Sequence, residues 1–504
     1  MGDPLDKPPL NGRSLRRRRV RAGAVRAAHL SLLSVVALVA LVPLAAGQGL
    51  GAGVDGGDRR ACAPAADRPA WGEAEIRASR TVHRVDLPAR PAAVFAGIDV
   101  RDLFVVVEAG HVTVLDGDRF EPVHRFPSGR ALHGAPTFTP DGRFAFFASR
   151  DGWVGKFDLW HLVLVAEVRA GVDTRGIAVS ADGGHVAVAN CLPHTLVLLD
   201  ADLNPLKVHA VRDKEGRKSS PVAAVYDAAP RQSFVAVLGE LPEVWEISYD
   251  PKAEDVPIGV IHDFLYREGA FVRGYLNPRR STLPVPLGGV SFTPDHSELL
   301  GGTRDGGKWM VVNLDVRKKI AELDLAGMAP AGAGVSWDRD GRRVMALPEP
   351  GRGAISVIDL ANWRTVTRIA TPGPVSFVQS HHATPYAWAD SATSDTADTL
   401  VVIDKRTLQR VADVKATPGR TLVHVEFTRD GRHVLASLRE RRADGGAVVV
   451  FDAATFAEVK RIPMDSPVGA FNVYHRIARP ADSGGTTVPG APLTGVNRGA
   501  AVHK

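Results

Sequence analysis

Two histidines in this sequence stand where an imidazole could do chemistry. His133 lies in "RALHGAPTF" and His424 lies in "TLVHVEFTRDG", each just ahead of the first strand of a predicted repeat. A neutral imidazole binds transition metals, and it can move protons near neutral pH. A histidine that only packs in the core fits the same local sequences, so these stretches leave both interpretations open.

The other reactive residues form no familiar catalytic motif. His381 and His382 stand side by side in "VQSHHATPYAW", but two adjacent histidines do not define a metal site. The sequence contains no G-x-S-x-G, no H-E-x-x-H and no nucleotide-binding glycine pattern at a strand–helix junction. Its two cysteines, Cys62 and Cys191, occur in neither C-x-x-C nor C-x-x-C-H, so the chain attaches no c-type haem of its own. A disulfide between them suits an exported protein but does not follow from the sequence.

The elements that position these side chains come from a repeat. A short β-branched run that ends in aspartate occurs eight times, with intervals of 42, 42, 50, 65, 44, 45 and 48 residues. Ahead of several copies lies a second run with a D-G turn, such as "FTPDGRFAFFASRDG" and "VSADGGHVAVAN". The repeated aspartates are Asp116, Asp158, Asp200, Asp250, Asp315, Asp359, Asp404 and Asp452.

Each repeat therefore predicts three or four antiparallel strands, because D-G pairs favour tight hairpins. Units of 40–50 residues with this pattern are typical of propeller blades. We predict an all-β fold, an eight-bladed β-propeller over residues 81–478. The first strand of a blade lies nearest the central axis, so the side chains of His133 and His424 could face the channel.

The ends of the chain differ from this body. Residues 1–28 contain eight basic and two acidic residues, which accounts for the whole net charge of +6 and leaves the rest neutral. A nucleic-acid-binding protein would carry its basic residues on the folded part, so this function is excluded. Residues 29–47 are apolar and resemble either a cleaved export signal or a single membrane anchor. We expect the body to lie outside the cytoplasm, with the membrane contacted only through this segment.

Three further segments interrupt or flank the repeats. Residues 48–80 are rich in glycine, alanine and aspartate and predict a flexible linker, and residues 479–504 predict a flexible tail. The long interval between Asp250 and Asp315 contains an insertion, "AEDVPIGVIHDFLYREGAFVRGYLNPRRSTLP". Its aromatic residues favour an ordered lid or rim loop over a disordered linker.

Longer phrases carry a resemblance that covers nearly all of residues 98–478. They include "ALHGAPTFTPDGRFAFFASRDGWVGKFDLW", "VRAGVDTRGIAVSADGGHVAVANCLPHTLVLLDADLNPLK", "SHHATPYAWAD" and "HVEFTRDGRHVLASL". Through them the chain resembles the cytochrome d1 haem-domain family, which includes cytochrome cd1 nitrite reductases and haem d1 biosynthesis proteins. The dihydro-haem d1 dehydrogenase branch is the most similar.

The resemblance implies a role for each candidate site residue. His133 would be the metal site as the proximal ligand to the haem iron, and Arg175 would pair with haem carboxylates through its forked donors. Arg150 is a second carboxylate partner, with a plain turn arginine as the alternative, and His381 is a further cofactor-binding residue. His424 matches a distal histidine that moves protons, and would be the catalytic residue.

The sequence also departs from the family. Where relatives carry a distal histidine, "AGMAPAGAGVSW" places Pro330, which cannot bind iron, and no cytochrome c domain is present. The resemblance implies one non-covalent haem d1 or dihydro precursor, whose propionate would be oxidised to an acrylate. A periplasmic electron carrier and the enzyme that receives haem d1 would be its partners. The alternatives are a haem d1 carrier without activity, a nitrite reductase-like protein, which the missing distal histidines disfavour, and a haem-free interaction propeller.

Overall fold

The computed structural model describes residues 71–477, apart from 264–267, 304–305, 328–333, 392–394 and 440–444. The predicted export segment (29–47), the basic segment before it and the tail (479–504) lie outside these residues, and so does most of the predicted linker. Within the described residues, no helix has both the length and the apolar character to cross a membrane.

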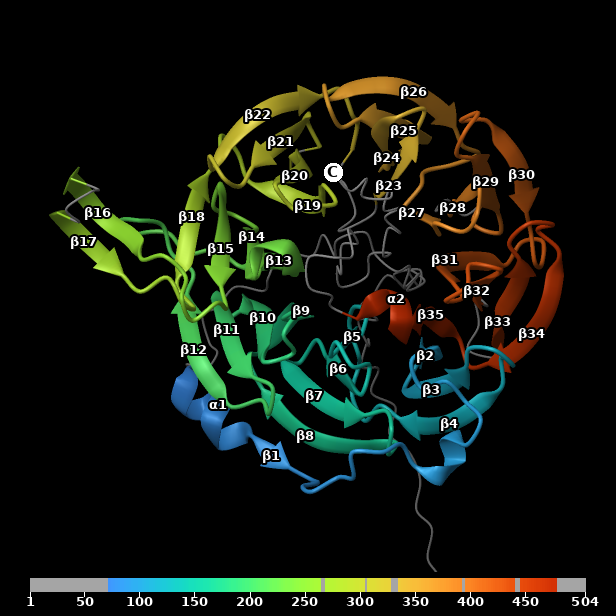
Figure 1. Cartoon of the computed structure of the whole chain (residues 1–504), viewed down its shortest axis with the longest axis horizontal. Helices are drawn as coiled ribbons and strands as arrows, with labels where there is room; N and C mark the ends of the chain where they lie inside the picture. The colour runs from blue at the N-terminus through green and yellow to red at the C-terminus, as the bar shows by residue number, and fades with distance from the viewer. Residues whose placement is uncertain are drawn as a thin grey trace, which may run out of the picture. The chain divides into compact units, whose positions relative to one another are not determined.

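Eight antiparallel sheets, seven of four strands and one of five, follow one another around a ring (Figure 1). We number them as blades 1–8 in chain order and give their strands from the centre outward. Blade 1 contains β35 (Pro467–Asn472), β2 (Leu103–Glu108), β3 (His111–Asp116) and β4 (Pro122–Pro127). Blade 2 contains β5 (Thr137–Phe138), β6 (Phe144–Ala148), β7 (Trp153–Asp158) and β8 (Val163–Arg169). Blade 3 contains β9 (Asp173–Val179), β10 (His185–Leu192), β11 (Thr195–Asp200) and β12 (Pro205–Ala210).

The remaining blades repeat this order. Blade 4 contains β13 (Val222–Ala228), β14 (Ser233–Leu238), β15 (Glu243–Ser248) and β18 (Pro278–Thr282), and blade 5 contains β19 (Leu287–Phe292), β20 (Glu298–Thr303), β21 (Trp309–Asn313) and β22 (Lys318–Leu323). Blade 6 contains β23 (Val335–Arg339), β24 (Arg342–Glu349), β25 (Ala354–Asp359) and β26 (Arg364–Ala370), and blade 7 contains β27 (Val378–Ser380), β28 (Tyr386–Ala389), β29 (Leu400–Asp404) and β30 (Arg410–Val414). Blade 8 contains β31 (Thr421–Phe427), β32 (His433–Arg439), β33 (Gly446–Asp452) and β34 (Glu458–Met464). The prediction of an all-β, eight-bladed propeller is confirmed.

The ring is closed by strands from both ends of the described chain. The innermost strand of blade 1, β35, pairs antiparallel with β2, with Val105 opposite Phe471. A short helix, α2 (Val473–Arg476), follows it directly. Because the last strand completes the first blade, no sheet of the ring is left without its inner strand. The chain runs from blade 8 into β35, so the hydrogen bonds between β35 and β2 within blade 1 close the ring.

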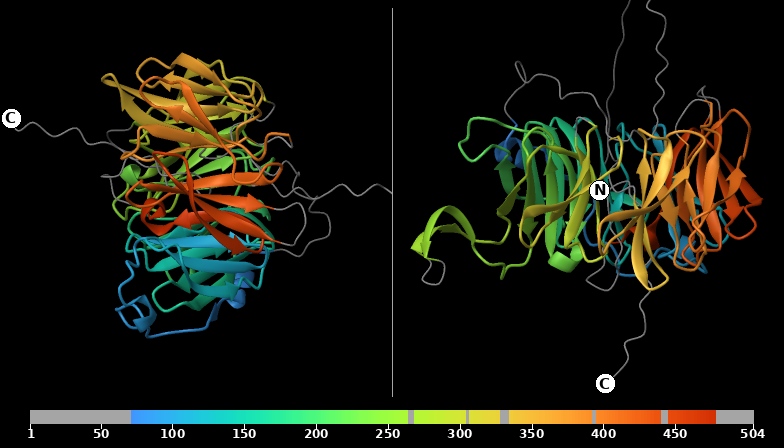
Figure 2. Two further views of the ribbon diagram at one scale, coloured as in Figure 1. Left: turned by 90° about the vertical axis from the view of Figure 1, so that its right-hand side faces the viewer. Right: turned by 90° about the horizontal axis from the view of Figure 1, so that it is seen from above.

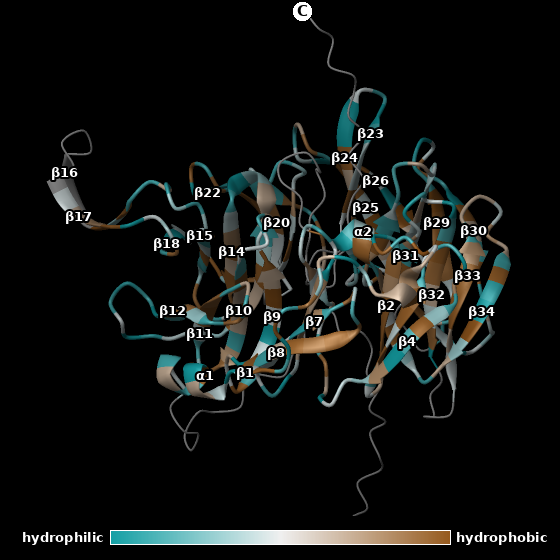
Figure 3. Cartoon of the chain, turned by 60° about the horizontal axis from the view of Figure 1, so that its bottom comes forward, coloured by the Kyte–Doolittle hydropathy of each residue, from teal (hydrophilic) through white to brown (hydrophobic). Residues whose placement is uncertain are grey.

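The core lies between neighbouring blades. The second strands of blades 1 and 4, β2 and β14, are buried at every position, which explains their continuous apolar sequences. The outermost strands, such as β26, alternate exposed and half-buried residues along most of their length. Figure 3 shows the same division, with hydrophilic residues on the outer strand β34 and apolar residues on the strands behind it.

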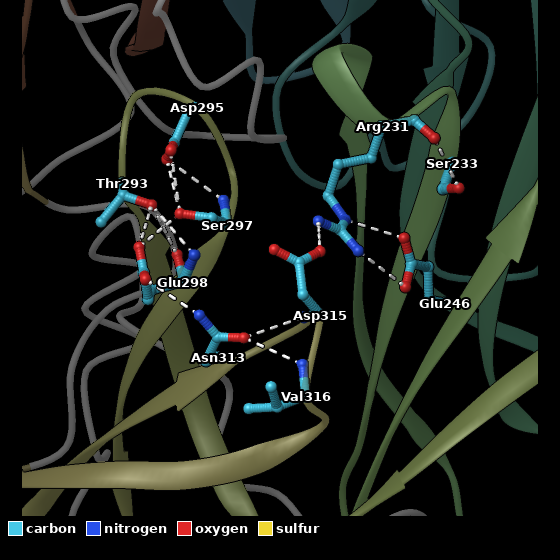
Figure 4. Close-up of polar contacts among 10 residues, drawn as sticks. All are labelled: Arg231, Ser233, Glu246, Thr293, Asp295, Ser297, Glu298, Asn313, Asp315 and Val316. Atoms are coloured by element: carbon cyan, nitrogen blue, oxygen red, sulfur yellow. Dashed lines mark hydrogen bonds and ion pairs between the residues drawn. The ribbon is translucent and has the colours of Figure 1, made fainter.

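The repeated aspartates end the third strand of most blades. In seven copies a carboxylate oxygen accepts a backbone N–H two residues later, as Asp200 does from Asp202 (2.9 Å). Blade 5 is the exception, although Asp315 lies in the turn as predicted. Asn313 fills the turn position by accepting from the backbones of Asp315 and Val316. The Asp315 carboxylate instead forms an ion pair with Arg231 of blade 4 (2.6 Å), as Figure 4 shows.

The predicted linker is partly ordered. Residues 73–79 form a helix, α1 (Glu73–Ser79), and β1 (Thr81–Val82) adds a fifth strand to the outside of blade 2. The side chain of Ile76 is fully buried against blades 2 and 3. The composition of residues 48–80 predicts flexibility throughout, but residues 71–80 are ordered. Trp71 packs on the same cluster, and its indole N–H donates to the Arg169 carbonyl (3.0 Å). Two single 3-10 turns, η1 (Ala93–Phe95) and η2 (Ala229–Arg231), complete the elements.

The insertion in blade 4 forms a hairpin. Strands β16 (Val256–Asp263) and β17 (Glu268–Val272) pair only with each other, between the third and fourth strands of the blade. The hairpin projects outward from the edge of the ring (Figures 1 and 2). The prediction of an ordered insertion is therefore correct for its described residues, which lie at the rim of the ring and do not cover it as a lid.

Candidate functional site

His133 is held just ahead of the inner strand of blade 2. Its neighbour Leu132 forms an isolated bridge with Ser149, and the His133 N–H donates to the carbonyl of Ala148 (2.9 Å). Gly134 follows with a φ of +77°, a conformation that glycine adopts at little cost. The chain thus turns into β5 directly after the imidazole, which is half-buried.

Arg150 belongs to the same short ladder as His133. Its backbone N–H donates to the carbonyl of Ala131 (3.3 Å), so the two residues lie on opposite arms of one bridge. The Arg150 side chain is exposed. The backbone register puts Arg150 and His133 on the same short ladder, and a plain turn arginine stays the alternative for Arg150.

Arg175 stands near the start of the inner strand of blade 3. Its guanidinium is half-buried, and it donates to the Asp173 carboxylate (3.0 Å) and to Sγ of Cys191 (3.4 Å). Cys191 is disulfide-bonded, whereas Cys62, the other cysteine of the chain, lies outside the described residues. The surrounding backbone is rigid, because the buried Asn190 bonds the Thr174 hydroxyl (2.8 Å) and the Ala170 carbonyl (2.9 Å).

His424 occupies a strained position in β31. Its φ is +57°, in the left-handed region, and it lies at a bulge where the pairing with β32 shifts between Val423 and Val425. A non-glycine residue in this conformation costs about 1–3 kcal/mol, and such residues cluster at functional sites. The side chain is 5% exposed, and its Nδ1 has no hydrogen-bond partner. The bulge thus turns a buried imidazole out of the regular strand pattern.

The surroundings of His424 keep its imidazole neutral. Its ring packs against Phe471 of β35 (4.5 Å between centroids) and near Phe377 (6.0 Å). Burial lowers the pKa of His424 well below its ordinary value, and the nearby cations Arg476 and Arg439 lower it further. At neutral pH this imidazole is therefore unprotonated, and it is a weaker base than an exposed histidine.

Arg476 is itself buried beside this ring. Its guanidinium stacks over Phe471 (5.0 Å) and donates twice to one oxygen of Glu426, at 2.6 and 3.0 Å. The two side chains are 3% and 2% exposed. This ion pair, together with Phe471, was not foreseen, because the partners come from elements distant in the sequence and no periodic pattern connects them.

The structure brings four of the predicted residues toward one region. His424 is in blade 8, its ring contact Phe471 in blade 1, His133 and Arg150 in blade 2, and Arg175 in blade 3, and these blades are consecutive around the ring. His133 and Arg175 both stand where inner strands begin, a side of the ring that we call the strand-start face. His424 lies deeper, in the middle of its strand.

His381 does not belong to this region, which corrects the prediction. It follows Ser380, the last residue of β27, so it lies in the hairpin where an inner strand ends. Its ring packs on Gly431, in the corresponding hairpin of blade 8, and near His475 (5.0 Å). We call this opposite side the strand-end face. Pro330, predicted at the distal position, lies outside the described residues.

These side chains fit a haem with free carboxylates. Iron takes a neutral imidazole as a ligand, and guanidinium groups pair with carboxylates in a bidentate manner. His133 offers a half-buried imidazole ahead of the inner strand of blade 2, Arg150 belongs to the same short ladder, and Arg175 lies near the start of the inner strand of blade 3. The unpartnered Nδ1 of the buried His424 is a polar atom that still lacks a hydrogen bond. His133 would hold the iron and the two arginines would hold the carboxylates.

Fold and site together define a class of protein, an eight-bladed propeller with an imidazole and arginines suited to a haem on one face. Residues 98–269 and 296–476 match the Cytochrome D1 heme domain family, and this chain belongs to that family.

Individual relatives agree. A dihydro-heme d1 dehydrogenase from Pseudomonas aeruginosa is 46% identical over 414 residues, which cover 81% of this chain and 78% of that protein. Protein NirF from Stutzerimonas stutzeri is 26% identical over 384 residues, covering 73% of this chain and 91% of that one. A solved structure of the dihydro-heme d1 dehydrogenase NirN in complex with DHE has a TM-score of 0.73 and 45% identity, and covers 81% of this chain and 83% of its own.

Proposed function

We propose that this chain binds dihydro-haem d1 without a covalent bond and dehydrogenates it to haem d1. The observation that carries the proposal is the strained, buried and neutral imidazole of His424, in a chain 46% identical to a dihydro-heme d1 dehydrogenase. The similar NirN structure in complex with DHE supports the choice of substrate.

The reaction converts a propionate side chain of the substrate into an acrylate. Two C–H bonds break on adjacent carbons, a carbon–carbon double bond forms, and two protons and two electrons leave. When bound, the haem iron supplies a route for the electrons. His133 positions the substrate, and Arg150 and Arg175 hold its carboxylates. The Nδ1 of His424 takes one proton, and the second goes to solvent.

The proposal includes a location and partners. Residues 29–47 would export the protein, as a cleaved signal or as an anchor, because a charge-free apolar stretch follows a basic one. No C-x-x-C-H site is present in this sequence, so a separate periplasmic carrier would accept the electrons. The product would pass to the enzyme that uses haem d1.

The test is an absorption titration of the purified protein with haem d1 and with its dihydro precursor. His133→Ala should abolish the spectral change or weaken binding at least tenfold, and His424→Ala should keep binding but lose conversion of the precursor. His124→Ala, on the outer strand β4, is the matched control and should behave like the parent protein. Binding without conversion in the parent protein, with a suitable electron acceptor present, would make it a haem d1 carrier. No spectral change with either ligand would refute both functions.

A further inference from the structure

A cavity lies on the strand-end face, between blades 6 and 7. Its volume is about 350 Å³. Blade 6 contributes the end of β23, including Trp337 and Arg339, and blade 7 contributes His381, His382, Lys405 and Arg406 from its two turns. His133 and Arg175 stand at the other ends of the inner strands, so this cavity is separate from the site described above.

The walls of the cavity are fastened to each other. The Trp337 indole N–H donates to the Lys405 carbonyl (3.0 Å), and Nε of Arg339 donates to the Arg406 carbonyl (2.8 Å). Both hydrogen bonds cross from blade 6 to blade 7. The backbone that carries Lys405 and Arg406 is therefore fixed relative to blade 6 before any ligand arrives.

The charges of the lining do not cancel. Asp338 forms an ion pair with Arg343 (2.8 Å), and Asp340 forms one with Arg339 (3.6 Å), so both carboxylates already have cationic partners. Lys405 has no ion-pair partner among the described residues of the chain, whereas the Arg406 guanidinium interacts with the Asp404 carboxylate, which lies outside the lining. The positive charge of Lys405 is therefore uncompensated.

Lys405 is the more unusual of the two cations. Nζ makes one hydrogen bond, to the carbonyl of His381 (2.9 Å), although an ammonium has three donors. Burial lowers the pKa of Lys405 to about 8. A half-buried lysine without a counter-ion costs free energy, and a bound anion would remove that cost.

His381 adds a donor to the same lining. Its Nδ1 accepts from the backbone N–H of Ala383 (3.1 Å), so the proton of the neutral ring is on Nε2. This Nε2 is buried and has no hydrogen-bond partner within the part of the chain that the structure describes. A buried polar side chain of this kind is rare in a structural turn and is expected where a ligand completes the site.

We propose that this cavity is a binding site for a small oxyanion, a phosphate or carboxylate group, with Lys405 and Arg406 as its cationic ligands. The point charge of the ammonium and the fork of the guanidinium both bind such oxygens by charge-assisted hydrogen bonds. This site requires neither haem nor the activity of His424, so its test is independent of the test of the proposed function.

The proposal predicts a pH dependence. An anion beside Lys405 raises its pKa towards the ordinary value, so binding at pH 8 takes up a proton, and affinity falls as the pH rises above about 8. The other charged or titratable groups that line the cavity with it are His381, His382 and Arg406 on its own blade, and Asp338, Arg339 and Asp340 on blade 6. Burial holds the pKa of His381 at about 4, so this ring stays neutral over the range tested.

The experiment is protection of Lys405 from acetic anhydride at pH 8, measured by peptide mass spectrometry on the full chain. Inorganic phosphate and citrate are the two probes, and Lys252, which is exposed and remote from the cavity, is the internal control. We expect protection of Lys405 and not of Lys252. If only phosphate protects Lys405, the cavity is a phosphate site, and if only citrate does, it is a carboxylate site. If both protect Lys405, the cavity is a general oxyanion site. Protection by neither probe at 20 mM overturns the proposal.

A calorimetric titration with the protecting probe provides the second measurement. Lys405→Met should weaken binding at least tenfold, because it removes a charge-assisted hydrogen bond. Arg406→Gln, at an exposed side chain that leaves the fold intact, should weaken it severalfold. Lys252→Met carries the same charge change and should leave affinity as it is. Equal affinities in all four proteins would also overturn the proposal.

Discussion

The buried ion pair between Glu426 and Arg476 permits a quantitative test of the packing beside His424. Both side chains are at most 3% exposed, and two N–H groups of Arg476 reach one oxygen of Glu426, at 2.6 and 3.0 Å. Glu426→Gln leaves the guanidinium buried without a counter-charge. Each hydrogen bond to a charged group contributes about 1.5–3 kcal/mol, so we expect the free energy of unfolding to fall by about 3–5 kcal/mol.

Removal of both charges of the Glu426–Arg476 pair should cost less stability than removal of one. Burial raises the pKa of Glu426 in spite of Arg476, so desolvation outweighs the attraction between the charges. The double variant Glu426→Gln/Arg476→Met should therefore recover most of the loss and unfold within about 1 kcal/mol of the parent protein.

The complete cycle needs four proteins: the parent, Glu426→Gln, Arg476→Met and the double variant. Their free energies of unfolding are measured by urea unfolding, followed by tryptophan fluorescence. The exposed pair Arg77–Glu73 provides the control, and Glu73→Gln should cost about 0.5 kcal/mol or less. A loss below 1 kcal/mol for Glu426→Gln, or a double variant whose loss equals the sum of the two single ones, would refute the reasoning.

Further predictions concern turns and histidines far from the ion pair. Gly431→Ala should lower the free energy of unfolding by more than ~2 kcal/mol in thermal unfolding, because its φ is +73° and a Cβ would lie 2.1 Å from the His381 ring. The control Gly419→Ala, with a φ of +75° and open space around the Cβ, should cost only about 1 kcal/mol. Burial lowers the pKa of His296 to about 4 in the fold. Its contribution to stability, about 3 kcal/mol, is therefore present above its unfolded pKa near 6.5 and is lost as the pH falls towards 4. His296→Asn should flatten that loss in urea unfolding at pH 7 and pH 5, and parallel curves for the two proteins would contradict it. Arg175→Gln should weaken binding of the dihydro precursor without abolishing it, as judged by the absorption titration.

Two carboxyl groups, those of Asp102 and Asp390, also make the stability of the fold depend on pH. Burial raises the pKa of Asp102 and of Asp390 to about 6, above an ordinary value of 3.8. These groups act in the opposite direction from His296, because the fold binds their protons more tightly and gains stability as the pH falls from 6 to 4. The comparison of His296→Asn with the parent protein removes this shared background.

The sequence by itself determined the repeat. Its β-branched runs, D-G turns and recurring aspartates are local features, and a propeller blade is a meander of neighbouring strands, so local signals were sufficient to predict eight blades. The same local logic placed His133 ahead of an inner strand. Its role as an iron ligand came from the resemblance to the cytochrome d1 haem-domain family, which the match over residues 98–269 and 296–476 confirms at the level of the family.

Only the tertiary structure decided which predicted residues meet. His381 and His424 both lie on inner strands or directly after them, but strand direction puts the first on the strand-end face and the second among Phe471 and Arg476. The ion pair beside His424 and the walls that surround Lys405 depend on contacts between blades. Such contacts join residues that are distant in the sequence, and no spacing or composition along the chain encodes them.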